Sequence, residues 1–147
     1  MMNLLKTSIA AILAFGISSA AMAACSDPAG PKVNWSGCDL SGANLDSANL
    51  FKADLSGANL ENAVLTYANL DHAIMKNANL RGAHMSNSSL IVTDLFNADL
   101  RGADLRGATV EHPTKGGWSI FLDAADLRGA LWIDGRTCDE KSYGVCH

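Results

Sequence analysis

The stretch SGANLDSANLFKADLSGANL, residues 41–60, carries leucine at every fifth position and alanine two places before each leucine. Apolar residues keep this spacing at fifteen consecutive positions, from Leu40 to Val110. A helix turns about 100° per residue and a strand alternates sides, so neither gathers residues five apart on one face. A period kept this strictly indicates a solenoid, in which each repeat forms one side of a winding coil.

The residue types inside each repeat fit this construction. We label the leucine position i. If each repeat turns the chain by about a right angle, four repeats close a coil of about twenty residues. Leucine at i and alanine at i−2 then point to the axis and stack on the next coil. Asn or Asp at i−1 bonds to nearby backbone groups, and glycine, frequent at i+2, permits unusual backbone angles. The sequence therefore predicts an all-β, four-sided solenoid with coils ~4.8 Å apart.

The repeats are similar to those of the pentapeptide-repeat family, whose motif is A-(D/N)-L-x-x. ANLDS, ADLSG, ANLRG and ADLRG match it, and the resemblance covers roughly residues 36–132. It implies a right-handed, quadrilateral β-helix. Some members of the family imitate duplex DNA and bind DNA gyrase, which requires a cytoplasmic location and long acidic rows. Arg81, Arg101 and Arg106 interrupt the rows here, and the formal net charge is only −4, so this role is disfavoured.

Residues 1–23 have the pattern of a bacterial secretory signal peptide. Lys6 precedes the mainly apolar run SIAAILAFGI, and AMA at residues 21–23 is a small-x-small cleavage site. A membrane anchor needs ~18–20 apolar residues, and this run stops earlier. We expect a periplasmic or secreted protein with no membrane attachment after cleavage. Lipidation of Cys25 is the alternative, but Met22 stands where a lipoprotein signal usually has leucine, and Cys38 would lose its partner.

Both ends of a solenoid expose a leucine layer and unpaired strand edges, so both need caps. Four cysteines remain after cleavage: Cys25, Cys38, Cys138 and Cys146. In an exported protein an even number predicts disulfides. The two ends would lie ~20 Å apart, whereas bridged Cα atoms lie within ~7 Å, which favours Cys25–Cys38 and Cys138–Cys146. Trp35 and Trp132 are the expected apolar plugs.

The register fails after Val110. The segment EHPTKGGWS contains the loop signals Pro113 and Gly116–Gly117. The period then resumes shifted by two, which is most simply interpreted as a two-residue insertion followed by three closing repeats. The predicted organisation is a signal peptide (1–23), an N-terminal cap (24–39), repeats (40–112), an inserted loop (113–119), closing repeats (120–133) and a C-terminal cap (134–147).

Catalytic chemistry is not indicated. His84 and Asp104 would be stacked neighbours, but no nucleophile lies beside them, and a surface hydrogen bond is the simpler interpretation. The cysteines are assigned to caps, and no phosphate-loop, HExxH or GxSxG motif occurs. Acidic and basic residues are interspersed, without a basic stripe for nucleic acid. We expect no enzyme activity, no cofactor and no metal.

Two features point instead to protein binding. In LIVTDLF, residues 90–96, the outward positions become apolar, so Ile91, Val92 and Phe96 could form a patch for a partner or for a second copy. The loop with Lys115 and Trp118 could bind as well, serve as a lid, or be a tolerated bulge. The expected function is a rigid interaction or scaffold module of the bacterial envelope or exterior. The alternative is a structural or stress-related envelope protein without a saturable partner.

Overall fold

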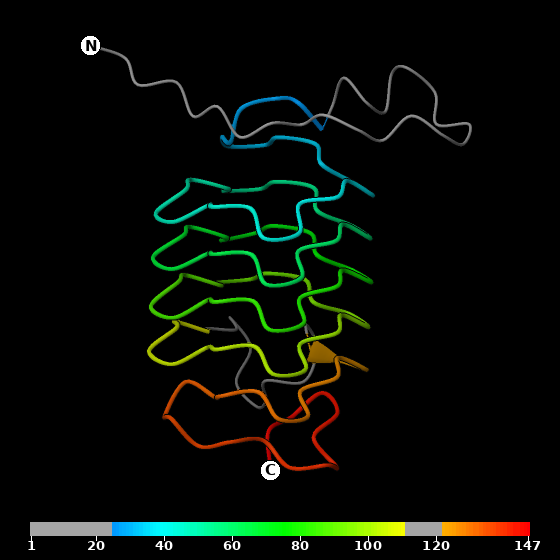
Figure 1. Ribbon diagram of the computed structural model, residues 1–147, viewed down its shortest axis with the longest axis vertical. Coiled ribbons are helices and arrows are strands. Elements are labelled where there is room, and N and C mark those ends of the chain that lie inside the picture. Colours follow the sequence, from blue (N-terminus) through cyan, green and yellow to red (C-terminus); the bar gives the residue numbers. More distant parts are fainter. Residues whose placement is uncertain (1–24, 111–121) are drawn as a thin grey trace.

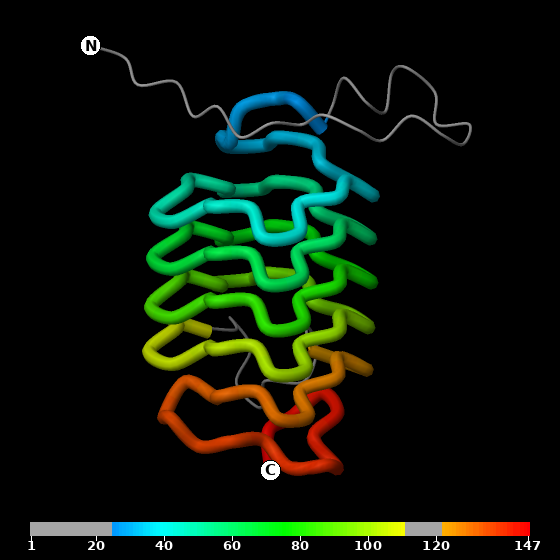
Figure 2. The backbone as a smooth tube through the Cα atoms, viewed as in Figure 1, coloured from blue at the N-terminus to red at the C-terminus, as the bar shows by residue number. Residues whose placement is uncertain are grey.

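The computed structural model describes residues 25–110 and 122–147 (Figure 1). The predicted signal peptide and the loop residues Lys115 and Trp118 lie outside this part. Within it the chain winds as a stack of coils, with the first coil at one end of the rod and the C-terminus at the other (Figure 2). No described helix is long and apolar enough to cross a membrane.

Parallel bridges join residues twenty apart from Asn34 to Thr109, for example Asp39 to Asn59 and Asn44 to Val64. Each bridge is a single residue at i−1, and a turn at i+1 and i+2 separates it from the next. The described residues form no longer strand, and Leu122 is their only helical residue. The predicted coil of four repeats is confirmed; its right-handed sense stays a prediction.

We name the four sides after the first coil, and each side continues in the coils below it: side A, residues 33–37; side B, 38–42; side C, 43–47; side D, 48–52. The register therefore starts one repeat before Leu40. Asn34 bridges Asp54, and Trp35, 3% exposed, holds the leucine position. The indole Nε1 of Trp35 is buried and has no hydrogen-bond partner among the described residues.

The core consists of the leucine and alanine columns. Leu50 and Leu70 are fully buried, as is Ala53 between them in the chain. Burying one leucine contributes roughly 1.5–3 kcal/mol, so the long column is the main source of stability. Outside the core, the i−1 side chain accepts the N–H of i+1, as Asp54 Oδ1 does from Ser56 at 3.0 Å. This local bond fixes each turn.

Every described residue at i+2 between Lys32 and Gly107 has a positive φ. Glycine and asparagine adopt this conformation at low cost, but a β-branched residue does not. Val92, with φ 58°, is the β-branched residue in this series. The segment around it therefore carries backbone strain that the other turns largely avoid.

The predicted two-residue insertion is wrong. Asp99 bridges Asp126 and Asp104 bridges Leu131, so 27 residues rather than twenty separate stacked neighbours across this point. Hence the chain between Val110 and Leu122 holds seven extra residues. Seven and two shift a five-residue period by the same amount, so the phase of the repeat could not distinguish them.

Both ends carry the predicted disulfides. Cys25 and Cys38 are bonded with Cα atoms 5.6 Å apart, and Cys138 and Cys146 with Cα atoms 4.9 Å apart. After the last coil the chain turns back as an antiparallel cap, residues 134–147. Antiparallel bridges join Asp126 to Tyr143 and Leu131 to Thr137, and this cap covers the last coil.

Candidate functional site

The His84–Asp104 pair does not form a catalytic dyad. The two residues are bridged through their backbones, but the Asp104 carboxylate is held by Arg106, with Nε 2.9 Å from Oδ1 and Nη2 2.7 Å from Oδ2. The hydrogen bonds from Arg106 lower the pKa of Asp104, more than the nearby His84 does. The described residues contain no group of histidine, cysteine and carboxylate side chains able to hold a metal ion.

The arginines of the ADLRG repeats in the C-terminal half pair with neighbouring aspartates, which balance their charge. In each ADLRG repeat the arginine at i+1 pairs with the aspartate at i−1 of the same repeat, as Arg128 does with Asp126 at 2.7 Å. Arg101 also reaches Asp126, at 3.5 Å. The hydrogen bond from Arg128 is the main cause of a lowered pKa of Asp126. These arginines are therefore engaged with carboxylates of the fold.

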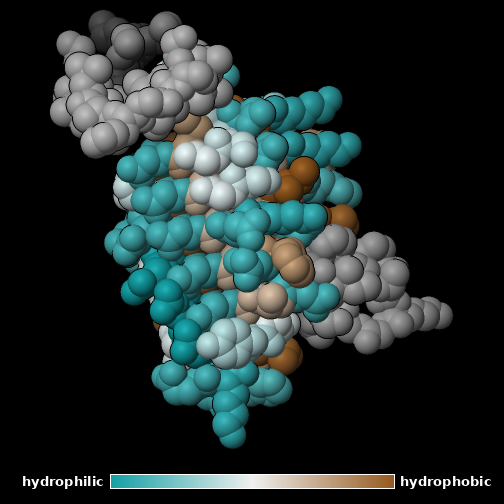
Figure 3. All heavy atoms as spheres, turned by 90° about the vertical axis from the view of Figure 1, so that its right-hand side faces the viewer, coloured by the Kyte–Doolittle hydropathy of each residue, from teal (hydrophilic) through white to brown (hydrophobic). Residues whose placement is uncertain are grey.

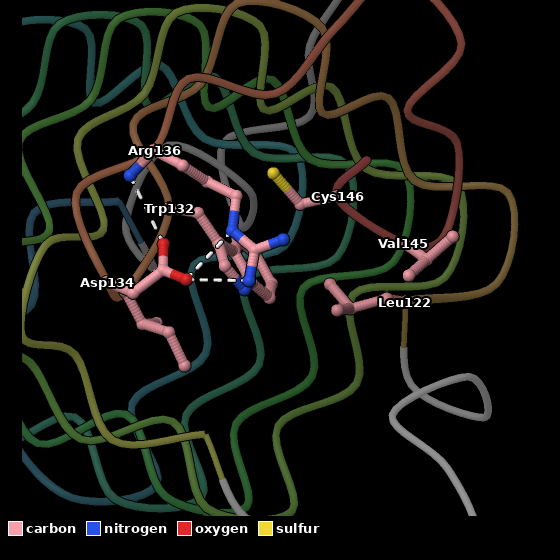
Figure 4. A pocket seen from close by; sticks show the side chains of 7 residues that line it. Leu122, Trp132, Asp134, Arg136, Val145 and Cys146 are labelled. Carbon is pink, nitrogen blue, oxygen red and sulfur yellow. Dashed lines mark hydrogen bonds and ion pairs between the residues drawn. The ribbon is translucent and has the colours of Figure 1, made fainter.

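A shallow cavity of about 360 Å³ lies at the C-terminal end (Figure 4). Seven residues line it: Leu122, Trp132, Ile133, Asp134, Arg136, Val145 and Cys146. Figure 4 shows Asp134 turned toward Arg136, whose Nε lies 2.8 Å from Asp134 Oδ2. The charged groups satisfy each other, and the remaining wall is mainly apolar, so the cavity has few polar groups to orient a ligand.

The strongest candidate is a patch on side A that extends from the turn between sides D and A to the turn between sides A and B. It contains three residues expected from the sequence, Ile91, Val92 and Phe96, and one that was not, Ile74. Phe96 is 48% exposed and Ile74 is 42% exposed, whereas Ile91 and Val92 are half-buried. We call these four residues the apolar corner. Figure 3 shows how sparse such side chains are on a mainly hydrophilic face.

Ile74 joins the patch because of its place in the coil. It occupies i−1 on side A and bridges Asp94, which lies two residues before Phe96 in the next coil. Most repeats have Asn or Asp at i−1, where the side chain caps the following turn. Isoleucine cannot form this bond and exposes apolar surface instead. The signal in the sequence is an apolar residue at a position that is ordinarily polar.

Other departures from the repeat cluster beside the corner. Ser88 and Thr93 replace alanine at i−2, and both are buried. The Ser88 hydroxyl donates to Met85 O at 2.7 Å, and the Thr93 hydroxyl donates to Leu70 O at 2.8 Å. Each polar group in the core is thus satisfied by a main-chain carbonyl, and the substitutions are accommodated rather than disruptive.

Asp71 repairs the turn that carries Ile91. The residue at i−1 of that repeat is Ser89, which does not cap the N–H of Ile91. That N–H donates to Asp71 Oδ1 of the previous coil at 2.9 Å, and the Ser89 hydroxyl donates to the same oxygen at 2.6 Å. A bond between coils replaces the usual bond within a repeat. The turn that carries Ile91 therefore keeps its geometry through a compensating bond.

Aromatic side chains extend the surface of side D away from the corner. The Phe51 and His72 rings meet edge to face with centroids 5.6 Å apart, and Lys52 Nζ lies 5.1 Å from the Phe51 centroid. His72 N–H donates to Ile91 O at 2.9 Å, which places it beside the corner. The sequence had not indicated this cluster as a site.

Comparisons with known proteins agree with the fold. The family model described as pentapeptide repeats matches residues 32–60, 44–82 and 73–111, which together make up more than half of the chain. A search of curated proteins found no match.

Three solved structures illustrate the likeness. Rfr23, a pentapeptide repeat protein of the cyanobacterium Cyanothece 51142, is 28% identical, with a TM-score of 0.54 and coverage of 77% of this chain and 82% of that one. A pentapeptide repeat protein from the thylakoid lumen of Arabidopsis thaliana is 27% identical, with a TM-score of 0.52 and coverage of 67% and 68%. HetL of Nostoc, involved in regulating heterocyst differentiation, is 32% identical, with a TM-score of 0.41 and coverage of 73%; this chain spans 41% of its length.

Proposed function

The chain belongs to the pentapeptide repeat family, and from this premise we propose that it is an exported, non-catalytic interaction module of the bacterial envelope or exterior. Its apolar corner binds a protein partner. The observation that carries the proposal is Ile74, which gives up the turn-capping side chain of its repeat and exposes apolar surface beside Phe96. A residue that departs from the repeat motif without stabilising the fold is expected to serve a function.

The proposed export rests on two features of the chain. The first is the signal-peptide pattern of residues 1–23, and the second is the pair of disulfides, which persist in oxidising compartments. The Arabidopsis relative from the thylakoid lumen is also a protein of a lumen outside the cytoplasm. Export is tested by mass spectrometry of the periplasmic and medium fractions, in which the chain should begin at Ala24 with both disulfides intact.

Binding at the apolar corner would use the rigidity of the solenoid. The side chains of the corner stand on turns fixed by coil-to-coil hydrogen bonds, so little conformational entropy is lost when a partner covers them. Phe96 is the expected anchor, since exposed aromatic residues dominate protein interfaces. The partner should offer an apolar side chain that packs between Phe96 and Ile74.

The decisive variant is Ile74→Asp. It restores the repeat motif and gives the N–H of Lys76 a capping carboxylate. The new carboxylate stands between Asp54 and Asp94 in the same column, so repulsion offsets this gain, and circular dichroism first checks that the variant is folded. Binding should be lost, because a charge replaces an apolar contact. Val64→Asp is the matched control: Val64 also stands at i−1 in place of Asn or Asp, but on side C.

Proximity labelling in native cells compares the wild type with both variants. We expect the same neighbouring proteins around the wild type and Val64→Asp, and the loss of one or more specific neighbours with Ile74→Asp. An identical set around all three proteins would contradict the proposal. It would favour the alternative, a structural or stress-related envelope protein without a saturable partner.

A further inference from the structure

The N-terminal end of the solenoid carries backbone groups without partners. In the later coils both the N–H and the C=O at i−1 face the preceding coil: the N–H of Asn59 donates to Cys38 O, and Asn59 O accepts from the N–H of Leu40. Asp39 and Asn44 hold this position in the first coil, on sides B and C. Among the described residues, no backbone hydrogen bond forms to the N–H or C=O of either.

Two of the four inward side chains along sides B and C of this edge are also incompletely covered, whereas Cys38, which is bonded to Cys25, and Leu45 are buried. Leu40 and Ala43 are half-buried, whereas Leu60 and Ala63, their neighbours in the next coil, are fully buried. A β edge with apolar side chains beside it is a template for pairing with another chain. The first coil thus presents both the hydrogen-bonding groups and the apolar layer that an added strand would cover.

We propose that a second copy of this chain pairs with this edge, forming a head-to-head dimer with two-fold symmetry. A two-fold axis at the corner between sides B and C sets side B of one copy antiparallel to side C of the other. Asp39 then lies opposite the partner's Asn44. The free N–H and C=O groups of the two residues exchange both bonds, as in a hydrogen-bonded antiparallel pair, and symmetry repeats the exchange.

The side chains match in this same register. Leu40 lies opposite the partner's Ala43, so a large side chain meets a small one at the two incompletely covered inward positions. The Asn44 amide can donate to the partner's Asp39 carboxylate. This repeats a bond already present inside the chain, where Asn59 Nδ2 donates to Asp39 Oδ1 at 3.0 Å. The edge is therefore complementary to itself, which is the requirement for an isologous interface.

The C-terminal end explains why pairing stops at two copies. There the N–H of Leu127 donates to Ser142 O and the N–H of Gly129 donates to Cys138 O, both at 2.9 Å. The antiparallel cap thus uses the edge that a head-to-tail filament would need. The end of a single coil is a small surface, and small interfaces are typical of transient complexes. We expect a dimer that dissociates on dilution.

Sedimentation equilibrium over a concentration series tests the dimer on the full chain, expressed with its own leader and purified with its disulfides oxidised. The average mass should rise from one chain toward two. Asn44→Pro removes the donor and places a ring on the edge, and it should abolish this rise. Asn49→Pro is the matched control, with the same position in the first coil but on side D, outside the interface, and it should still dimerise.

A second measurement keeps the proposal testable if a proline variant fails to fold. Amide exchange of Asp39 and Asn44 in the wild type should slow as the concentration rises, while exchange of Asn49 stays constant. A mass of one chain at all concentrations up to about 1 mM would overturn the dimer. So would dimerisation of a folded Asn44→Pro variant, or assemblies larger than two copies. If the edge instead receives a strand of another protein, the purified chain remains monomeric.

Discussion

Both ends of the solenoid are capped by a disulfide and a tryptophan, but they differ in how far the backbone groups of the terminal coil are hydrogen-bonded. Each has one local disulfide and one tryptophan at a leucine position, Trp35 or Trp132. At the C-terminal end the chain doubles back, and its carbonyls receive the N–H groups of the last coil. At the N-terminal end the described loop reaches side B through the Cys25–Cys38 disulfide, but among the described residues it makes no backbone hydrogen bond to Asp39 or Asn44. A disulfide fixes a loop in place, but only backbone pairing completes a β edge.

The difference follows from how much chain each end has and where it runs. Residues 134–147 return antiparallel over two sides of the last coil. Before the first coil, the N–H of Lys32 donates to Phe51 O on side D, and Cys25 is tied to Cys38. The C-terminal coil should therefore behave as interior, and the N-terminal coil as surface. The following experiments test this difference between the two ends.

Truncation of the leucine column should give the largest effect. Leu127→Ala lies in the last coil but is fully buried, so it should lower the free energy of unfolding by about 2–5 kcal/mol, as should Leu70→Ala in mid-stack. Leu40→Ala in the first coil removes a half-buried side chain and should cost only about 1 kcal/mol. Chemical denaturation at low protein concentration measures all three. Equal losses of unfolding free energy for Leu40→Ala and Leu127→Ala would show that the first coil is buried as fully as the last.

Removing the disulfides should give the next largest effect. By the loss of loop-closure entropy alone, Cys25–Cys38 and Cys138–Cys146 should contribute similar amounts, about 3 and 2.5 kcal/mol. The segment that is released should differ between the two variants. Paired Cys→Ala substitutions at the C-terminus should free the cap and expose Trp132, and those at the N-terminus should expose Trp35. Tryptophan fluorescence with quenching distinguishes the two. Unchanged quenching after loss of the C-terminal bridge would mean that backbone pairing alone holds the cap.

A smaller effect is expected midway between the ends. Val92→Asn relieves the strain of a β-branched residue at positive φ, and should raise the free energy of unfolding by about 1 kcal/mol. In a solenoid each coil contacts only its neighbours, so the exchange of amides in the first and last coils should not change. Amide exchange across the whole chain checks this. Slower exchange at either end would mean that strain at the corner loosens that end, and that the ends are coupled.

The sequence predicted the parts of this molecule that repeat. Five-residue spacing fixed which residues lie inside, and stacking at twenty residues followed from counting four right-angled sides. Separation along the chain was enough to assign the disulfides. These inferences succeed because the hydrophobic period directly reflects the geometry of the coil, in which residues five apart occupy equivalent positions on successive sides.

The sequence was less informative where the chain leaves the period. A phase shift of two is compatible with two or seven inserted residues, and only the bridge between Asp99 and Asp126 distinguishes them. The rescue of Ile91 by Asp71 involves two coils, so no inspection of one repeat reveals it. Ile74 was overlooked because its position is ordinarily a turn cap. Compensation between coils is a tertiary property, and the same holds for the unpaired edge of the first coil.

Acid should reduce the contrast between the ends, by the smallest of these effects. Hydrogen bonds from Arg101, Arg106 and Arg128 lower the pKa values of their partner aspartates in the C-terminal half. At the N-terminal end Asp39 also has a lowered pKa, first because of its hydrogen bond with the Ser41 side chain. A carboxyl with a folded pKa below its unfolded value of about 3.9 stabilises the fold above that pH. This contribution disappears as the pH falls through the folded pKa.

More such groups lie near the C-terminus, so between about pH 5 and pH 2 the protection factors of the amides should fall more in the last coil than in the first. The change should be modest, because these ion pairs are partly exposed and are screened by solvent. Asp126→Asn removes one group and should flatten the pH dependence of thermal unfolding. Asp123→Asn is the control, since among the described residues Asp123 forms no ion pair. If the amides of the first coil lose protection at a higher pH than those of the last coil, the exposed edge, rather than the paired carboxylates, determines which end unfolds first in acid.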